Sequence, residues 1–332
     1  MTGLWSDVYL PVAQKIREYG GNFISALVCR AVIDEIDERA DRGDLVLIEK
    51  RNRIIASLQN GDWPYDPVAF SAFFEIYHEA LFYILADRRS VGLTAIPEGS
   101  DKTPDFTTTA SPVEAFEIKT IDFTGGEFAY SAMANSALDA QIKASEESTR
   151  KGVGFAATEV QPHGDAKDSK EAIERVMRQI DGNVKAGQFE TYPTFLVVPL
   201  IRTALRASSE ELDQTRLDPD GGESISGHLW TIAFHGVGEP FYDATDSRGS
   251  RCLGSLERAG ILKDHAFIRG LVFVHTEWSE LGDASQGNLA CIDRSYRLYG
   301  EWNDNYAVPP SVEGVPETPN ESAFAKLCDE WR

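Results

Sequence analysis

The feature that most constrains this chain is a long apolar segment that follows Pro67. The sequence VAFSAFFEIYHEALFYILA continues to about Asp87 without a helix-breaking residue. Pro67 suits the first position of a helix and Asp66 suits its N-cap, so we expect a helix to begin there. Nearly every side of this helix is apolar, which predicts that it is buried.

Three ionisable side chains, Glu75, His78 and Glu79, interrupt the apolar surface of this helix. Unpaired carboxylates are costly inside a protein, so we expect a neighbouring group to compensate them. For Glu79 the residues leave two alternatives open, an ion pair with Arg88 or Arg89 and exposure to solvent.

A β-hairpin is predicted after the apolar helix, because Thr, Val, Phe and Ile favour extended chain. It contains DFTTTASPVEAFEIKTIDF, and a short strand is expected before it, near 91–96. Alternate side chains of a strand lie on opposite faces, so Glu117 and Lys119 share one face of the second arm. Asp105 begins the first arm and can approach Glu117 across the adjacent strands.

Helical and extended segments alternate on both sides of this hairpin. Helical spacing is expected in the first sixty residues, at 135–151, and after Asp168, which with Glu171 forms an N-terminal cap. The sequences VGFAATEV and TFLVVPLI read as strands, the second of them fully buried. This order predicts a mixed α/β architecture.

The C-terminal third gives weaker signals. A loop is expected at 208–224, and strands at HLWTIAFHGV and IRGLVFVHTEW could extend the same sheet. Between them SLERAGIL predicts a short helix. The Pro-rich stretch YAVPPSVEGVPETPNES predicts an irregular surface segment before a short helix at AFAKLCDEW.

Composition limits the class of protein. The chain has 332 residues, of which 42% are hydrophobic, enough for a sizeable core. No stretch approaches the length of a membrane span, and the N-terminus lacks the layout of a signal peptide, so we expect a cytoplasmic protein without membrane contact. The cysteines are scattered, which predicts reduced thiols rather than disulfides or a zinc site. They are Cys29, Cys252, Cys291 and Cys328.

The charge balance bears on possible partners. With 32 basic and 53 acidic residues the formal net charge is −21, which repels polyanions. A nucleic-acid-binding chain of this kind must concentrate its positive charge locally, borrow it from a protein partner, or bind divalent metal among its carboxylates. The alternative is that the acidity only keeps the surface soluble.

The hairpin carries the residues with the clearest chemical meaning. Hydrolysis of a phosphodiester needs a hard cation held by carboxylate and carbonyl oxygens. Asp105, Glu117 and Lys119 can supply two carboxylates and an amine at one place. The competing interpretations are that Asp105 only opens a turn, and that Glu117 and Lys119 form an exposed polar strand edge.

With Pro104-Asp105 followed by Glu117-Ile118-Lys119 on an apolar strand, the chain resembles the PD-(D/E)xK nuclease superfamily. The resemblance implies that Asp105 and Glu117 bind Mg²⁺, for which Mn²⁺ can substitute. It also implies that the main-chain carbonyl of Ile118 joins them and that Lys119 positions or activates the attacking water.

The same resemblance implies further site residues. The family often presents another glutamate from the helix before the hairpin, for which we favour Glu79 over Glu75. A polar residue on the helix after the catalytic strand often contacts substrate or the active site. Gln141 and Lys143 are candidates, with Gln179 as an alternative.

The resemblance implies a restriction-endonuclease-like fold, with a mixed central sheet flanked by helices. The expected parts are an N-terminal helical region at 1–65, the nuclease-like core at 66–205, and a C-terminal extension at 206–332. The extension would continue the sheet or form a recognition region.

The function expected from this resemblance is that of a DNA endonuclease in restriction or anti-phage defence. Because many nucleases of this fold act as dimers, the resemblance also implies a homodimer. Two alternatives stay open. One is a catalytically silent binding module that uses its acidic surface to dock a basic partner. The other is an RNA-cleaving toxin, because the same metal chemistry cleaves either polymer.

Overall fold

The computed structural model describes most of the chain in thirteen stretches. These are residues 3–18, 28–61, 63, 67–97, 103–121, 130–153, 168–200, 215–217, 223–225, 227–244, 250–277, 289–312 and 314–331. The chain forms two compact units, each assembled from separate stretches of the sequence. Unit 1 contains 1–80, 122–165 and 280–292, and unit 2 contains 81–121, 166–279 and 293–332.

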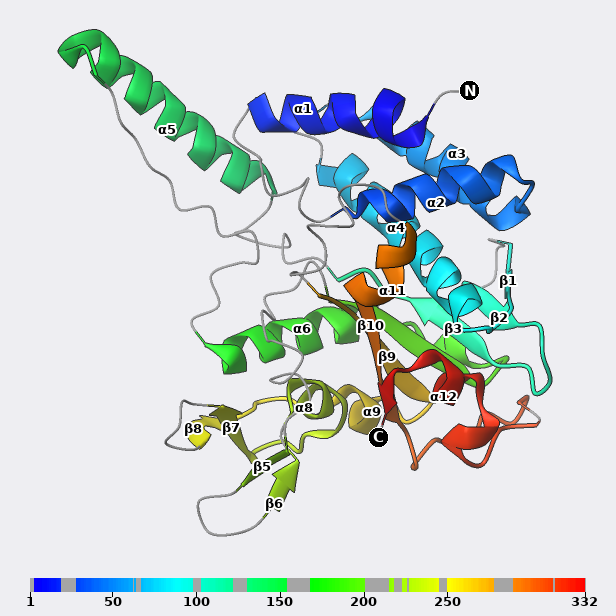
Figure 1. Cartoon of the computed structure of the whole chain (residues 1–332). Helices are drawn as coiled ribbons and strands as arrows, with labels where there is room; N and C mark the ends of the chain where they lie inside the picture. The colour runs from blue at the N-terminus through cyan, green and yellow to red at the C-terminus, as the bar shows by residue number, and fades with distance from the viewer. Residues whose placement is uncertain are drawn as a thin grey trace. The chain divides into compact units, whose positions relative to one another are not determined.

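The described elements of unit 1 are helical (Figure 1). They comprise the π-helix η1 (Leu4–Tyr9), α1 (Leu10–Glu18), α2 (Arg30–Asp41), α3 (Leu45–Asn60), the first part of α4 (Pro67–Arg88), α5 (Tyr130–Lys151) and the 3₁₀ turn η4 (Leu289–Cys291). The Asp44 carboxylate caps α3 by accepting the N–H groups of Val46 and Leu47. The predicted helical character of the N-terminal residues and the predicted helix after Pro67 are confirmed.

The carboxylate of Glu79 on α4 is compensated within unit 1. Lys50 of α3 is buried and places Nζ 2.5 Å from Glu79 Oε2, and Arg53 lies 4.0 Å from the same oxygen. Arg88 and Arg89 pair with aspartates of unit 2 instead, so the alternative in which one of these arginines pairs with Glu79 is wrong. Helix α3 supplies the cation because its Lys50 side chain lies against α4, a tertiary contact without a local sequence signal.

Unit 2 is built on a mixed seven-stranded sheet (Figure 1). In spatial order its strands are β1 (Leu93–Ala95), β2 (Phe106–Thr108), β3 (Ala115–Ile118), β4 (Thr194–Pro199), β9 (Gly270–Thr276), β10 (Tyr296–Trp302) and β11 (Glu330–Trp331). Strands β1, β2 and β3 form an antiparallel meander, β3, β4 and β9 are parallel, and β10 is antiparallel to β9. The predicted hairpin and mixed α/β sheet are therefore confirmed, and strands from the C-terminal third complete the sheet.

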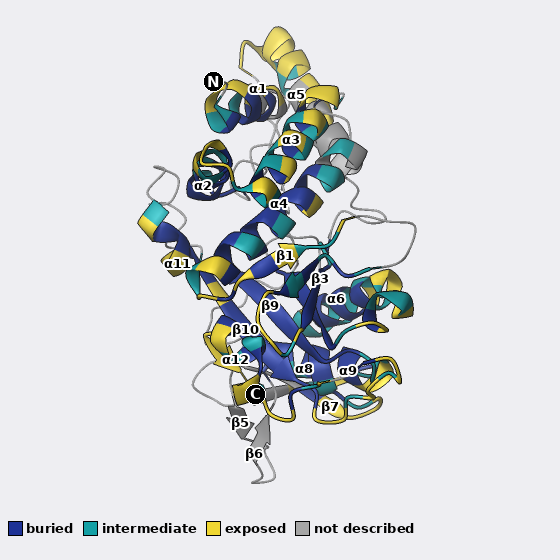
Figure 2. Cartoon of the chain, turned by 90° about the vertical axis from the view of Figure 1, so that its right-hand side faces the viewer, coloured by how far each residue is buried: buried dark blue, intermediate teal, exposed yellow. Residues whose placement is uncertain are grey.

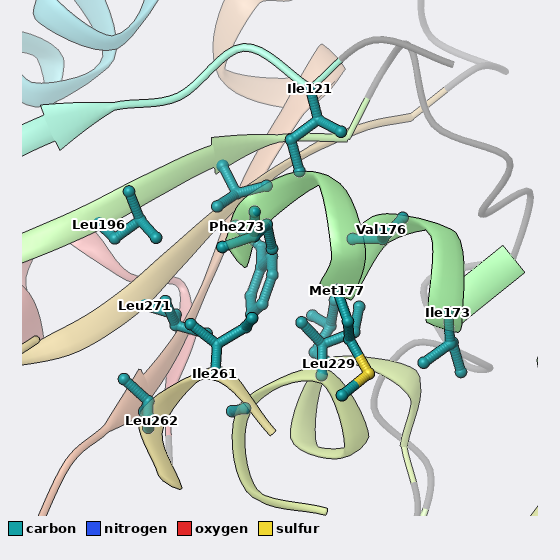
Figure 3. Close-up of a cluster of buried hydrophobic side chains, with 14 of the residues drawn as sticks. Ile121, Ile173, Val176, Met177, Leu196, Leu229, Ile261, Leu262, Leu271 and Phe273 are labelled. Atoms are coloured by element: carbon teal, nitrogen blue, oxygen red, sulfur yellow. The ribbon is translucent and has the colours of Figure 1, made fainter. Parts of the chain in front are cut away.

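One face of this sheet is covered by α6 (Ser169–Asn183), α8 (His228–Phe234) and α9 (Ile261–Asp264). Figure 3 shows the buried cluster that joins them, which includes Ile173 and Met177 of α6, Leu196 of β4 and Phe273 of β9. Ile121, just after β3, belongs to the same cluster. The predicted cap of α6 is confirmed, because the Asp168 side chain accepts the N–H of Glu171 at 2.9 Å.

The opposite face of the sheet is lined by aromatic rings. Phe116 of β3 contacts Phe82 from the unit 2 part of α4 and stacks on Phe195 of β4. Phe324 of α12 (Ala323–Leu327) stacks on Phe195 in turn. The central strands are buried on both faces (Figure 2), which explains their nearly continuous apolar sequences.

The C-terminal third contains several differences from the sequence expectations. The segment predicted as a strand at 228–237 forms α8, because Leu229, Ile232 and Ala233 recur at helical spacing and are all buried. The predicted loop at 208–224 contains β5 (Thr215–Leu217) and the start of β6 (Glu223–Ile225), which pair with each other. The helix expected at 255–262 begins later, as α9 at Ile261. Its expected first residue, Ser255, instead ends strand β8 (Ser250–Ser255), which pairs with β7 (Pro240–Ala244).

Other outcomes concern shorter elements. Strand β10 has no counterpart among the predicted strands, while the predicted strand at 153–160 lies almost wholly outside the described residues. The expected C-terminal helix is α12, followed by β11 instead of further helix. The remaining short elements are η3 (Ala186–Phe189), α11 (Ile292–Ser295) and η5 (Pro319–Glu321).

The segment after β10 is fixed by two buried charges that precede parallel strands. Arg269, just before β9, donates to the carbonyls of Asn303 at 2.9 Å and Pro316 at 2.7 Å, and its guanidinium lies 3.6 Å from the Trp302 ring centroid. Glu114, just before β3, accepts from Ser322 Oγ at 2.5 Å and from the N–H of the next residue at 2.6 Å. Strands β3 and β9 run in the same direction, so both charges lie at the amino ends of their strands, at the same edge of the sheet. We call Arg269, Glu114 and their hydrogen-bond partners the amino-edge clamp.

The cysteines and the apolar character of the helices bear on two expectations from composition. All four cysteines are free thiols, and three of them are buried, as predicted for core filling. Within the described part of the chain, no helix combines the length and the apolar character needed to cross a bilayer.

Candidate functional site

Asp105 occupies a bend just before β2 and takes part in the pairing of β2 with β3. Its main-chain N–H donates to the carbonyl of Phe116 at 3.1 Å. Its carboxylate Oδ2 accepts the N–H of Ile118 at 2.7 Å, a place that a main-chain carbonyl takes in a regular ladder. The Asp105 carboxylate is therefore held beside the main chain that links Glu117 to Lys119.

Glu117 lies in the middle of the sheet, next to Leu196 of β4 in the β3–β4 register. Its exposed fraction is only 1%. Residues paired across adjacent strands lie on the same face of a sheet, so Glu117 points to the face of Leu196, which belongs to the cluster that α6 covers. A carboxylate in this position needs polar partners, because burying an unpaired charge is strongly unfavourable. The interpretation of Glu117 as an exposed strand edge is wrong.

Two side chains donate to the same oxygen of Glu117. The ammonium group of Lys119 forms a close ion pair with Oε1, which confirms that Glu117 and Lys119 share a face. The side-chain amide of Gln188 donates to Oε1 at 2.5 Å. Lys119 retains 19% of its side-chain exposure, so its amine lies between the buried carboxylate and solvent.

Gln188 is a site residue that the sequence did not reveal. It belongs to η3, the 3₁₀ turn between α6 and β4, and the next residue, Phe189, is anchored in the core cluster. The Oε1 atom of Gln188 is buried and has no hydrogen-bond partner among the described residues, which leaves an acceptor for a ligand that carries a donor. No local pattern marks this residue, because its partner Glu117 is brought to it only by the pairing of β3 with β4.

The donor set is suited to a hard cation. The Asp105 and Glu117 carboxylates and the Ile118 carbonyl are oxygen ligands of the kind that Mg²⁺ and Mn²⁺ prefer, and Mg²⁺ commonly keeps several waters when few protein ligands are present. Among the residues that the structure describes, no three His, Cys, Asp or Glu side chains gather into a group that could hold a metal ion. The oxygen ligands that these residues could offer a cation are therefore two carboxylates and a main-chain carbonyl, with water for the remaining positions.

The other predicted site residues belong to different elements. Glu79 lies on the unit 1 part of α4 and is paired with Lys50, while Glu75 is exposed on the same helix. Gln141 and Lys143 lie on α5, also in unit 1, and Lys143 is exposed. Their proposed roles as a metal ligand and as substrate contacts stay predictions.

Gln179, the alternative substrate contact, lies on α6 in unit 2. It is half-buried, and its main-chain carbonyl accepts the side-chain amide of Asn183 at 2.8 Å. Its place on the helix that covers the Glu117 face is compatible with the role of a substrate contact, which stays a prediction.

Comparison with known proteins adds no family to this geometry. No protein-family model, no curated protein and no solved structure matches the chain. The arrangement of Asp105, Glu117, Lys119 and Gln188 is therefore the only basis for a proposal about function that the described residues and these comparisons supply.

Proposed function

We propose that this chain is a metal-dependent nuclease with Asp105, Glu117 and Lys119 as its catalytic centre. The observation that carries the proposal is the hydrogen bond from the N–H of Ile118 to the Asp105 carboxylate. This bond holds the Asp105 carboxylate beside the main chain of Ile118, the residue between Glu117 and Lys119, which form an ion pair. Two acids, a peptide carbonyl and an amine thus occur together on one pair of strands, the combination that phosphodiester hydrolysis requires.

Each residue has a distinct part in this proposal. The carboxylates of Asp105 and Glu117 and the carbonyl of Ile118 would hold Mg²⁺, which supplies a Lewis acid and lowers the pKa of a bound water. The amine of Lys119 would orient the attacking water or a phosphate oxygen. Gln188 would keep the Glu117 carboxylate in position through its amide.

DNA is the first substrate to test, and restriction or anti-phage defence is the setting that the sequence resemblance suggests. The net charge of −21 opposes nonspecific binding of a polyanion. We therefore propose that binding depends on bound cations near the site or on a basic protein partner. A homodimer would allow both strands of a duplex to be cut.

The test is cleavage of plasmid DNA, single-stranded DNA and RNA by the purified full chain with Mg²⁺ or Mn²⁺. Asp105→Asn, Glu117→Gln and Lys119→Met should each lower the rate by about a hundredfold or more, because each removes a ligand or the positioning amine. Lys170→Met is the matched control, since Lys170 pairs with Glu174 on α6 in the same unit. Its activity should equal that of the wild type.

The outcomes separate the candidate functions. Equal cleavage by the wild type and all three site variants would show that the activity comes from another site or from a contaminant. Absence of cleavage on every substrate would contradict the nuclease and favour the binding module, which the acidic composition supports. Preference for RNA would keep the site and assign the chain to RNA cleavage.

A further inference from the structure

The ion pair between Lys119 and Glu117 bears on how a cation reaches the candidate site. Both Lys119 and Gln188 contact the same oxygen, Oε1, of a carboxylate that is almost completely buried. One donor carries a full positive charge and the other is neutral. The buried carboxylate is therefore already charge-balanced by the lysine.

A divalent cation at this carboxylate would be a second positive charge within a few ångströms of the ammonium group. Two positive charges this close repel each other even in the partly screened environment of a protein surface, and the repulsion is greater for a divalent ion than for a monovalent one. The neutral amide of Gln188 meets no such repulsion. Of the two donors on Oε1, Lys119 is thus the one that an approaching cation repels.

We propose that Lys119 competes with the divalent cation for Glu117 and withdraws from Oε1 when the cation binds. This inference rests on the proposed function, because it assumes that Glu117 is a metal ligand. Lys119 has a flexible stem and a partly exposed side chain, so its amine can swing toward solvent without leaving a buried charge behind. The ion pair would thereby set the concentration of metal at which the site fills.

The Lys50–Glu79 pair in unit 1 shows what a fixed lysine looks like. Lys50 retains only 8% of its side-chain exposure, and it contacts Glu49 as well as Glu79. A lysine held in this way has little path to solvent. Lys119 is more exposed, which is the condition that a displaceable counter-ion needs.

The experiment is a calorimetric titration of the full chain with MnCl₂ alone, without nucleic acid. Lys119→Met keeps most of the side-chain stem and removes the charge, so it should bind Mn²⁺ on the order of tenfold more tightly than the wild type. Lys170→Met, which removes a lysine from another ion pair in unit 2, should bind as the wild type does. Circular dichroism verifies that each variant is folded, and Lys119→Gln replaces the methionine variant if that one is not.

The outcomes distinguish this inference from the proposed function. Equal or weaker Mn²⁺ binding by Lys119→Met would overturn the competition, while binding that Asp105→Asn and Glu117→Gln abolish would keep the metal site. Absence of Mn²⁺ binding in the wild type and in both lysine variants would overturn the metal site and the competition together. Tighter binding by Lys119→Met that Glu117→Gln abolishes supports both.

Discussion

Two regions of unit 2 bury charged side chains, the candidate site around Glu117 and the amino-edge clamp around Arg269 and Glu114. In the clamp the buried groups are bonded largely to the main chain, to two carbonyls and one N–H of the segment after β10. In the candidate site Glu117 is bonded to side chains, Lys119 and Gln188. Main-chain partners are fixed by the fold, whereas side-chain partners can change rotamer. Burial alone therefore does not distinguish the two regions, whereas the kind of partner does.

The largest effect is expected in the clamp, for Arg269→Met. The variant leaves the carbonyls of Asn303 and Pro316 without their donor and removes the positive charge near Glu114. The free energy of unfolding should therefore fall by about 3 kcal/mol or more. Urea denaturation measures this loss. Arg269→Lys is the control that keeps the charge but not the paired geometry, and its loss should be smaller. A loss below about 1 kcal/mol for Arg269→Met would show that the clamp is not structural.

Glu114→Gln should have the next largest effect, and this effect should depend on pH. Burial raises the pKa of Glu114 above its ordinary 4.5, although the hydrogen bonds from Ser322 and Ala323 act in the opposite direction. The folded state therefore binds the proton more tightly than the unfolded state does. The contribution to stability is greatest below pH 4.5 and is lost as the pH rises through the raised pKa.

For Glu114→Gln we expect a loss of about 2 kcal/mol in the free energy of unfolding near pH 4, because a hydrogen-bonded acid is replaced by an amide. The difference from the wild type should shrink as the pH rises toward neutrality. Urea denaturation between pH 4 and pH 7 measures this trend. A difference that grows with pH would mean that the ionised carboxylate is the stabilising form.

The smallest effect on stability is expected in the candidate site, for Gln188→Leu. The variant removes one donor from the buried Glu117 carboxylate, and Lys119 still balances the charge, so the loss should be about 1.5 kcal/mol. Urea denaturation gives the loss, and Gln179→Leu, on the neighbouring helix, is a matched control. A loss as large as that of Arg269→Met would remove the distinction between the two regions.

Much of the fold could be predicted where local signals agreed. The helix after Pro67, the cap at Asp168 and the apolar strand at 194–199 are confirmed because capping, periodicity and breakers point to the same element. The segment 228–234 was predicted wrongly because a short apolar run is compatible with helix or strand until its neighbours are known. Strand β10 at 296–302 was not predicted, because its polar residues and glycine do not form the apolar pattern of a buried strand. Its burial comes from the neighbouring strands of the sheet.

The candidate site divides in a similar way. Strand alternation was enough to place Glu117 and Lys119 on one face, and the hairpin was enough to bring Asp105 near them. Gln188 could not be found, because its contact with Glu117 depends on the pairing of strands that are distant in the sequence. The ion pair of Lys50 with Glu79 could not be predicted for the same reason, since it depends on the packing of α3 against α4.

The parallel pairing of β4 with β9 has a consequence for how the molecule forms. The two strands are adjacent at the centre of the sheet, yet α8 and the β7–β8 hairpin are encoded between them. Contacts between distant parts of a chain require closure of a long loop, which slows folding and leaves apolar edges exposed in the meantime. During synthesis the meander β1–β2–β3 and strand β4 can emerge first, but the open edge of β4 stays uncovered until the ribosome has delivered β9. Expression at lower temperature, or with a chaperone that shields such an edge, should therefore favour the soluble product.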